Sequence, residues 1–240
     1  MPPAEVQSKY VGSSGVEAFK ETALFWNLTR NAMAETGNGI HAGTRVVDVG
    51  VGWGRTYRWM LRDLEARNIR GLDVDIAAVD MCRTAMPDGD FRHISPSDAY
   101  PVDGGLFDLA LYYSVFSHLS EAAARGALEH ARQALNPNGL VALTTLRMAH
   151  IDLWDRHRSE GRYLDALNAC QFDRVEWWER AAEGQHLYVP TGGGDPSRPA
   201  ETYGEAVVPK GWWETVDGYR LLKFERLTGL PQVYVVLQKV

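Results

Sequence analysis

One stretch constrains the fold more than any other: residues 45–56, which read RVVDVGVGWGRT. Val46–Val49 suit a short buried strand, and three glycines follow at alternate positions before a helix. Glycine adopts positive φ and lets a ligand approach the backbone, and the free N–H groups at the start of a helix favour polar or anionic groups. The stretch therefore predicts a strand–turn–helix unit with a nucleotide at the turn; the alternative is an ordinary tight turn.

Strands and helices alternate over the following hundred residues. Strands are expected at 45–49, 69–73, 91–94, 107–112 and 140–144, with helices between them. Single helices between strands imply right-handed crossovers and a parallel sheet, with ligands at the carboxyl ends of the strands. Two last strands, 221–225 and 232–237, are joined by residues 226–231 and should be antiparallel neighbours.

The spacing of the turn narrows the class of nucleotide. It is G-x-G-x-G, with Arg55 and Thr56 where a dinucleotide fingerprint would have its third glycine, and this disfavours NAD or FAD. Asp73 ends the second strand, about 20 residues beyond the turn, where a carboxylate accepts ribose hydroxyls. Helix capping is the alternative role for Asp73, and Asp75 is better placed for that.

Here the sequence resembles the class I S-adenosylmethionine-dependent methyltransferases. Four motifs occur in that family's order and at its usual separations: VVDVGVGWGR at 46–55, GLDVD at 71–75, FDLALYYSVFSHL at 107–119 and LNPNGL at 135–140. YVGSS at 10–14 is similar to the arm of bacterial members, including ones linked to glycan or secondary-metabolite modification. The resemblance implies an α/β, Rossmann-like sheet of seven strands in the order 3-2-1-4-5-7-6, with strand 7 antiparallel and a lid inserted between strands 5 and 6.

The resemblance also implies S-adenosylmethionine as cofactor, with S-adenosylhomocysteine as product. Gly50, Gly52 and Gly54 would back the methionine part, Asp73 would hold the ribose, and Val74 would flank the adenine. The other expected cofactor contacts are Tyr10, Gly12, Asp48, Val51, Ser97, Tyr113 and Ser114. Residues 95–98 depart from the family's common pattern after the third strand, so the residue that contacts the adenine stays open.

We expect one methyltransferase domain over residues 1–240. It comprises an N-terminal arm and helix (1–40), a cofactor-binding core (41–145), an acceptor-lid insertion (146–218) and a terminal hairpin (219–240). The insertion should hold helices near 152–160 and 163–181, and it contains five of the eight tryptophans. Tryptophan faces suit sugar rings or planar polyketides, although some of these tryptophans are expected to pack the lid onto the sheet.

Two histidines are candidates for the catalytic base. Methyl transfer from a sulfonium needs mainly alignment, but a hydroxyl acceptor must also lose its proton, for which histidine is the commonest base. His118 follows the fourth strand and His150 follows the fifth. The alternative role of His118 is to cap the next helix, and the alternative for His150 is a surface position. Residues 150–157 contain two histidines and two aspartates, so a divalent metal is possible but not favoured, because Asp152 and Arg156 would form an i,i+4 pair on a helix.

The net charge and the hydropathy of the chain limit the kinds of partner that it can have. The net charge is −6 and no basic block offsets it, which argues against nucleic acid. No run approaches the ~18 apolar residues of a membrane span, and Cys82 and Cys170 lack metal or redox spacing. We therefore expect a cytoplasmic protein with no membrane partner; the oligomeric state is open.

The leading hypothesis is methyl transfer to a hydroxyl of a saccharide or secondary metabolite. N- or C-methylation of a small metabolite is the runner-up within the class. A catalytically silent cofactor-binding protein and an NAD-dependent dehydrogenase are the alternatives outside it, the latter disfavoured by the glycine spacing.

Overall fold

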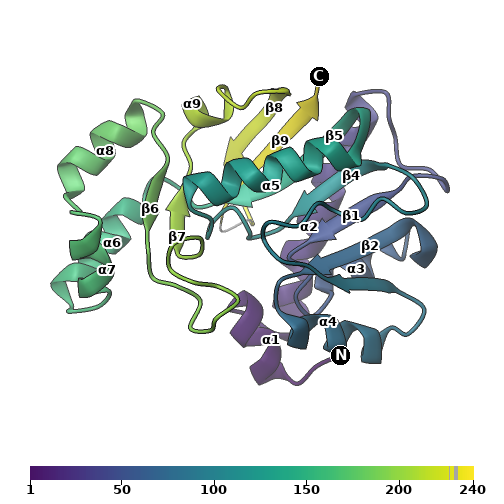
Figure 1. Ribbon diagram of the computed structural model, residues 1–240, viewed down its shortest axis with the longest axis horizontal. Helices are drawn as coiled ribbons and strands as arrows, with labels where there is room; N and C mark the ends of the chain where they lie inside the picture. Colours follow the sequence, from purple (N-terminus) through teal and green to yellow (C-terminus); the bar gives the residue numbers. More distant parts are fainter. Residues whose placement is uncertain (227, 230–231) are drawn as a thin grey trace.

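The computed structural model describes residues 1–226, 228–229 and 232–240, and its centre is one large sheet (Figure 1). The seven strands lie in the order β3-β2-β1-β4-β5-β9-β8. They are β1 (Val46–Val49), β2 (Ile69–Asp73), β3 (Asp90–His93), β4 (Phe107–Tyr112), β5 (Leu135–Thr145), β8 (Tyr219–Arg226) and β9 (Val233–Lys239). Strands β1 to β5 pair in parallel, and β9 runs antiparallel to both β5 and β8. The predicted order and the antiparallel last strand are confirmed.

Helices cover both faces of this sheet, because its strands are apolar on both sides. Val46 belongs to the core under α2 (Gly15–Glu35), α3 (Arg55–Met60) and α4 (Ile76–Ala85). Val47 and Val49 belong to the opposite core, under α5 (Glu121–Ala134) and α9 (Lys210–Trp213). A 3₁₀ turn, η1 (Ala66–Asn68), precedes β2.

The glycine turn after β1 is fastened to the end of β2. The backbone N–H groups of Gly50 and Val51 both donate to the Leu72 carbonyl, at 2.8 and 3.0 Å. The turn therefore lies directly beside Asp73, at the carboxyl edge of the sheet, where the strand pattern predicts a ligand.

The insertion between β5 and β8 forms a separate layer at one end of the sheet (Figure 1). It contains α6 (His150–Ser159), α7 (Leu164–Ala169), α8 (Arg174–Ala182) and a two-stranded sheet of β6 (Leu187–Val189) and β7 (Glu205–Val207), followed by α9. Its return towards the large sheet is bonded to the segment after β4: Gly204 N–H donates to the His118 carbonyl at 2.7 Å, and Ala206 N–H to the Ser117 carbonyl at 2.8 Å.

Packing explains most of the insertion's tryptophans. The buried ones are Trp154, Trp177, Trp212 and Trp213. Trp154 and Trp177 meet edge to face at 5.5 Å in a small core inside the insertion, whereas Trp178 donates its indole N–H to Asp152 at 3.1 Å. These tryptophans stabilise the insertion, and they do not line the cavity described below.

The local structure differs from the sequence-based expectation in places. The N-terminal arm itself contains a helix, α1 (Ala4–Val11). The helix expected over 163–181 is two helices, since Gln171 takes a positive φ of 53° and Asp173 starts α8 by accepting the Glu176 N–H at 2.9 Å. In the expected hairpin loop, Leu227, Leu230 and Pro231 lie outside the described residues.

Within the described part of the chain, no helix is both long and apolar enough to cross a membrane.

Candidate functional site

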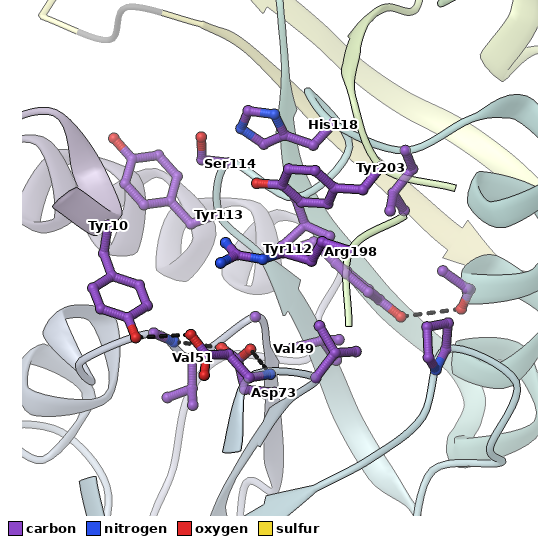
Figure 2. A pocket seen from close by; sticks show the side chains of 18 of the residues that line it. Tyr10, Val49, Val51, Asp73, Tyr112, Tyr113, Ser114, His118, Arg198 and Tyr203 are labelled. Atoms are coloured by element: carbon purple, nitrogen blue, oxygen red, sulfur yellow. Dashed lines mark hydrogen bonds between the residues drawn. The ribbon is translucent and has the colours of Figure 1, made fainter. Parts of the chain in front are cut away.

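A cavity of about 200 Å³ opens at the carboxyl ends of β1, β2 and β4. Helix α1 encloses it from one side, and the loop between β6 and β7 (190–204) encloses it from the other (Figure 2). Of the residues predicted to contact a cofactor, the structure brings eight to this cavity: Tyr10, Gly50, Val51, Gly52, Asp73, Val74, Tyr113 and Ser114. His118 lines it as well.

The first two glycines of the turn form one wall of the cavity. Gly50 and Gly52 have φ of 74° and 53°, a region that side chains other than glycine rarely adopt. A Cβ on Gly50 would lie 2.5 Å from the Val115 side chain. Gly54 differs: a Cβ there would lie 2.7 Å from Met86, so this glycine serves packing against α4 and does not line the cavity.

Asp73 is fixed by backbone donors on both carboxylate oxygens. Its Oδ2 accepts the Gly52 N–H at 2.8 Å and its Oδ1 accepts the Asp75 N–H at 2.9 Å. Burial raises the pKa of this carboxyl, and the two backbone hydrogen bonds oppose that rise. Because each carboxylate oxygen has further lone pairs, this arrangement can accept two hydroxyl groups from a bound ribose.

An apolar wall continues the cavity beyond Asp73. Val74 and Ile94 lie there with Tyr100 and with Ala123 and Ala127 of α5. The Tyr112 hydroxyl bonds to Tyr100 and to the Ala127 carbonyl, at 3.0 and 3.1 Å, which fixes this wall. In the loop after β3, Pro96 lines the cavity and Ser97, the predicted contact, does not.

Tyr10 of α1 closes the cavity over the glycine turn. Its hydroxyl donates to Asp75 Oδ2 at 2.8 Å, and its ring lies 3.8 Å from the position of a Cβ on Gly52. Gly12 does not line the cavity; with φ of 72° it ends α1, and its N–H donates to the Ser8 carbonyl at 2.8 Å.

Asp48 does not line the cavity either. It lies buried in β1, and its Oδ2 has no hydrogen-bond partner among the described residues. Burial and the neighbouring Asp73 raise its pKa to about 8, against the attraction of Arg55. Asp48 is therefore mostly protonated at neutral pH.

His118 faces the cavity in a defined tautomer. Its Nδ1 lies 2.8 Å from the Gly204 carbonyl, which can only accept, so Nδ1 carries the proton in the neutral ring. The ring stacks on Tyr203 at 4.9 Å with an interplanar angle of 8°, and Figure 2 shows it next to Ser114. Burial lowers the pKa of His118, and the bond to Gly204 opposes this. The remaining nitrogen, Nε2, is a base that can take a proton from a ligand in the cavity.

His150 is held elsewhere. Its Nε2 lies 3.4 Å from Glu205, which also accepts the Trp154 indole N–H, and it does not line the cavity. Although burial raises the pKa of Glu205, the hydrogen bonds from His150 and Trp154 hold it below its ordinary value. In the stretch 150–157, where a metal was possible but not favoured, Asp152 pairs with Arg174. Across the described ranges, no three histidine, cysteine or acidic side chains form a group that could hold a metal ion.

A polar network supports the end of β4. Ser114 has a positive φ of 63°, a strained conformation for a serine. Its N–H donates to the Thr144 hydroxyl at 2.8 Å, and its own hydroxyl accepts from Gln232 at 2.9 Å. Thr144 and Gln232 also bond to each other. Two chain segments distant in sequence, those of Thr144 and Gln232, thus hold Ser114 at the cavity.

Some cavity residues were missed by the sequence analysis. Arg198 and Tyr203 come from the β6–β7 loop, whose sequence gives no local signal of where it folds. Arg55 also lines the cavity, and it directly follows the glycine turn. Of these, only Arg55 could have been found, from its adjacency to the motif.

Replacing Gly204 with alanine is expected to destabilise the protein by about 1–3 kcal/mol, because overpacking against rigid backbone costs energy of this order. The new Cβ would lie 2.2 Å from the Val189 carbonyl oxygen. Gly126→Ala in α5 is the matched control: no heavy atom lies within 4 Å of its Cβ position, and helix propensity predicts a gain of about 0.5–1 kcal/mol. Chemical unfolding measures both. Equal stability of the two variants would contradict the packing described for Gly204.

Comparison with known proteins gives a family match for the core. Residues 46–139 match the family model described as a methyltransferase domain. No curated protein matches the sequence.

Solved structures match over almost the whole chain. Magnesium protoporphyrin IX methyltransferase from Synechocystis PCC 6803 with bound SAH is 11% identical, with 98% of this chain and 94% of that one covered and a TM-score of 0.60. The N-methyltransferase NodS from Bradyrhizobium japonicum WM9 in complex with SAH is 10% identical, covers 99% of both chains and has a TM-score of 0.56. The CurJ carbon methyltransferase is 16% identical, with 97% of this chain and 57% of that one covered and a TM-score of 0.55. At these identities the likeness establishes the fold.

Proposed function

We propose that this chain is a class I S-adenosylmethionine-dependent methyltransferase, and that it methylates a hydroxyl group of a saccharide or secondary metabolite with His118 as the base; the methyltransferase-domain match over residues 46–139 and the shared fold support this. The observation that carries this proposal is the imidazole at the cavity, with Nδ1 bonded to the Gly204 carbonyl and Nε2 left to accept a proton.

The residues around the cavity fit the cofactor. Gly50 and Gly52 line the cavity, and Gly52 leaves open the space that a Cβ would fill, with only the Tyr10 ring within 4 Å of it, which suits the methionine chain. Asp73, held by two backbone N–H groups, would accept the ribose hydroxyls. Val74, Tyr100 and Pro96 would contact the adenine, and Tyr10 would cover the cofactor from α1. When bound, the cofactor supplies an electrophilic methyl group and its own leaving group.

The protein's part in the reaction is alignment and proton removal. Ser114, held by Thr144 and Gln232, would form the floor beneath the acceptor oxygen. Tyr203 would stack on the acceptor side of the cavity and keep the His118 ring in its plane. The lowered pKa keeps His118 neutral and therefore basic at neutral pH. His150 is not proposed as the base, because Glu205 engages it away from the cavity.

N- or C-methylation is the second candidate. It is favoured by solved structures of similar fold that are named as an N-methyltransferase and a carbon methyltransferase. An amine with a free lone pair would need no base, so the role of His118 distinguishes these reactions.

A methyl-transfer screen tests the proposal. The protein is incubated with S-adenosylmethionine and panels of sugars, phenols and amines, and formation of S-adenosylhomocysteine is measured. We expect turnover with hydroxyl compounds. Turnover with amines alone would support the second candidate. S-adenosylhomocysteine binding without any turnover would support a silent cofactor-binding protein, and a thermal shift with NAD instead would indicate a dehydrogenase.

A further inference from the structure

A buried cation lies in the cavity wall beyond the glycine turn. Arg55, the first residue of α3, is 6% exposed and lines the cavity together with Tyr113. Its guanidinium lies over the Tyr113 ring at 4.4 Å from the centroid. A buried charge is costly unless hydrogen bonds and an opposite charge compensate it. The partners of Arg55 therefore indicate whether it serves the fold alone.

The compensation within the protein is incomplete. Nη1 makes both hydrogen bonds of the guanidinium, to the Ala18 carbonyl and to Glu21 of α2, and both are long at 3.4 Å. The Glu21 side chain is 28% exposed against 8% for Arg55, so water screens this ion pair on the acidic side. Asp48, the other nearby acid, is mostly protonated at neutral pH. Neither of these two bonds uses Nε or Nη2 of the planar fork, and the guanidinium also interacts with the Tyr113 side chain.

The second arginine of the cavity is already occupied. Arg198 donates from Nε to Asp195 at 2.9 Å, and its Nη2 bonds to the same carboxylate. Its guanidinium also lies 5.4 Å from the centre of the Tyr203 ring. Of the two arginines that line the cavity, Arg198 uses Nε and Nη2 to bind Asp195, whereas Arg55 uses only Nη1 in its bonds to Ala18 and Glu21.

We propose that Arg55 binds the α-carboxylate of the cofactor's methionine part through the free edge of its guanidinium. This rests on the proposed function, since it takes the cavity to hold S-adenosylmethionine. The glycine turn ends at Arg55, so a methionine chain lying along Gly50 and Gly52 ends within reach of it. A planar fork with two parallel donors matches the geometry of a carboxylate. The Tyr113 ring supports the guanidinium for this contact.

Two ligands that differ only in the carboxylate test the assignment. Isothermal titration calorimetry measures the affinities for S-adenosylhomocysteine and for its decarboxylated analogue, which keeps the adenosine, the sulfur and the amine. In Arg55→Gln we expect affinity for S-adenosylhomocysteine to fall roughly 10- to 100-fold, the range for losing a charge-assisted bidentate contact. Affinity of Arg55→Gln for the analogue should stay within about threefold of that of the unmodified protein, because the analogue has no carboxylate for Arg55 to bind. Lysine has a point charge and no planar fork, so the affinity of Arg55→Lys for S-adenosylhomocysteine should lie between those of the unmodified protein and Arg55→Gln.

Two further variants separate binding from folding. Glu21→Gln removes the internal partner of Arg55 and should leave S-adenosylhomocysteine binding unchanged or tighter. Arg198→Gln should change the affinities for both ligands by the same factor. The proposal is overturned if Arg55→Gln weakens both ligands equally, if Glu21→Gln reproduces the loss, or if the selective loss appears in Arg198→Gln. If the unmodified protein binds neither ligand, the proposed function itself fails.

Discussion

Asp73→Ala is expected to weaken S-adenosylhomocysteine binding at least about 100-fold, corresponding to roughly 3 kcal/mol. The change removes a carboxylate whose two oxygens organise the glycine turn and the start of α4. It also leaves the Gly52 and Asp75 N–H groups without their acceptor, so the turn loses its support at the point where the ribose would bind. Calorimetry with S-adenosylhomocysteine measures the effect.

A control for this prediction lies on the adjacent helix. Asp80→Asn changes an exposed acid of α4 that pairs with Arg83, and it should leave the affinity unchanged. The thermal stability of both variants without ligand must be measured, because loss of the Asp73 carboxylate also affects folding. A folded Asp73→Ala protein that binds S-adenosylhomocysteine normally would show that the ribose is held by other residues.

His118→Asn is expected to lower kcat by about 10²–10⁴-fold with a hydroxyl acceptor, the range for losing a general base. Asparagine suits this test because its amide N–H can still donate to the Gly204 carbonyl while no basic nitrogen remains. The loss therefore reports on proton removal rather than on the attachment of the insertion. His150→Asn, which changes a histidine outside the cavity, should retain turnover within a few-fold of the unmodified protein.

The pH dependence gives a second measure of the same residue. Burial lowers the pKa of His118 below the ordinary value of 6.5. The active form is the neutral one, which predominates above the pKa in the folded protein, so kcat/KM should fall only at pH values below 6.5. Full turnover in His118→Asn, or an acid limb centred above 6.5 that survives this substitution, would rule out His118 as the base.

The sequence predicted the core of the fold well because that part is locally encoded. Apolar runs, the glycine turn and the breaks between helices indicate β1 to β5, and the family resemblance implied the order of the sheet. The site was predictable to the same extent: Gly50, Gly52 and Asp73 occupy consecutive strand ends, which a parallel sheet necessarily brings together.

The remainder depends on contacts between distant segments. Tyr203 and Arg198 reach the cavity only because residues 203–206 are bonded to the segment after β4. The tryptophans suited an acceptor surface, but Trp154 and Trp177 pack in the insertion's own small core, and Trp212 and Trp213 pack in the core of the large sheet. His118 and His150 each follow a strand of the sheet, and their sequence positions could not distinguish them, because only the fold places Glu205 beside one and Gly204 beside the other.

The hydrogen bonds between His118 and Gly204 also make the state of the imidazole ring depend on the position of the insertion. One residue of the insertion, Gly204, is bonded to both the backbone and the ring of this histidine, 86 positions earlier in the chain. While the insertion is seated, the imidazole has one tautomer and one orientation. Without this contact the ring would be free to rotate and to exchange its proton between the two nitrogens. In the proposed reaction, the contact that closes the cavity therefore also prepares the base.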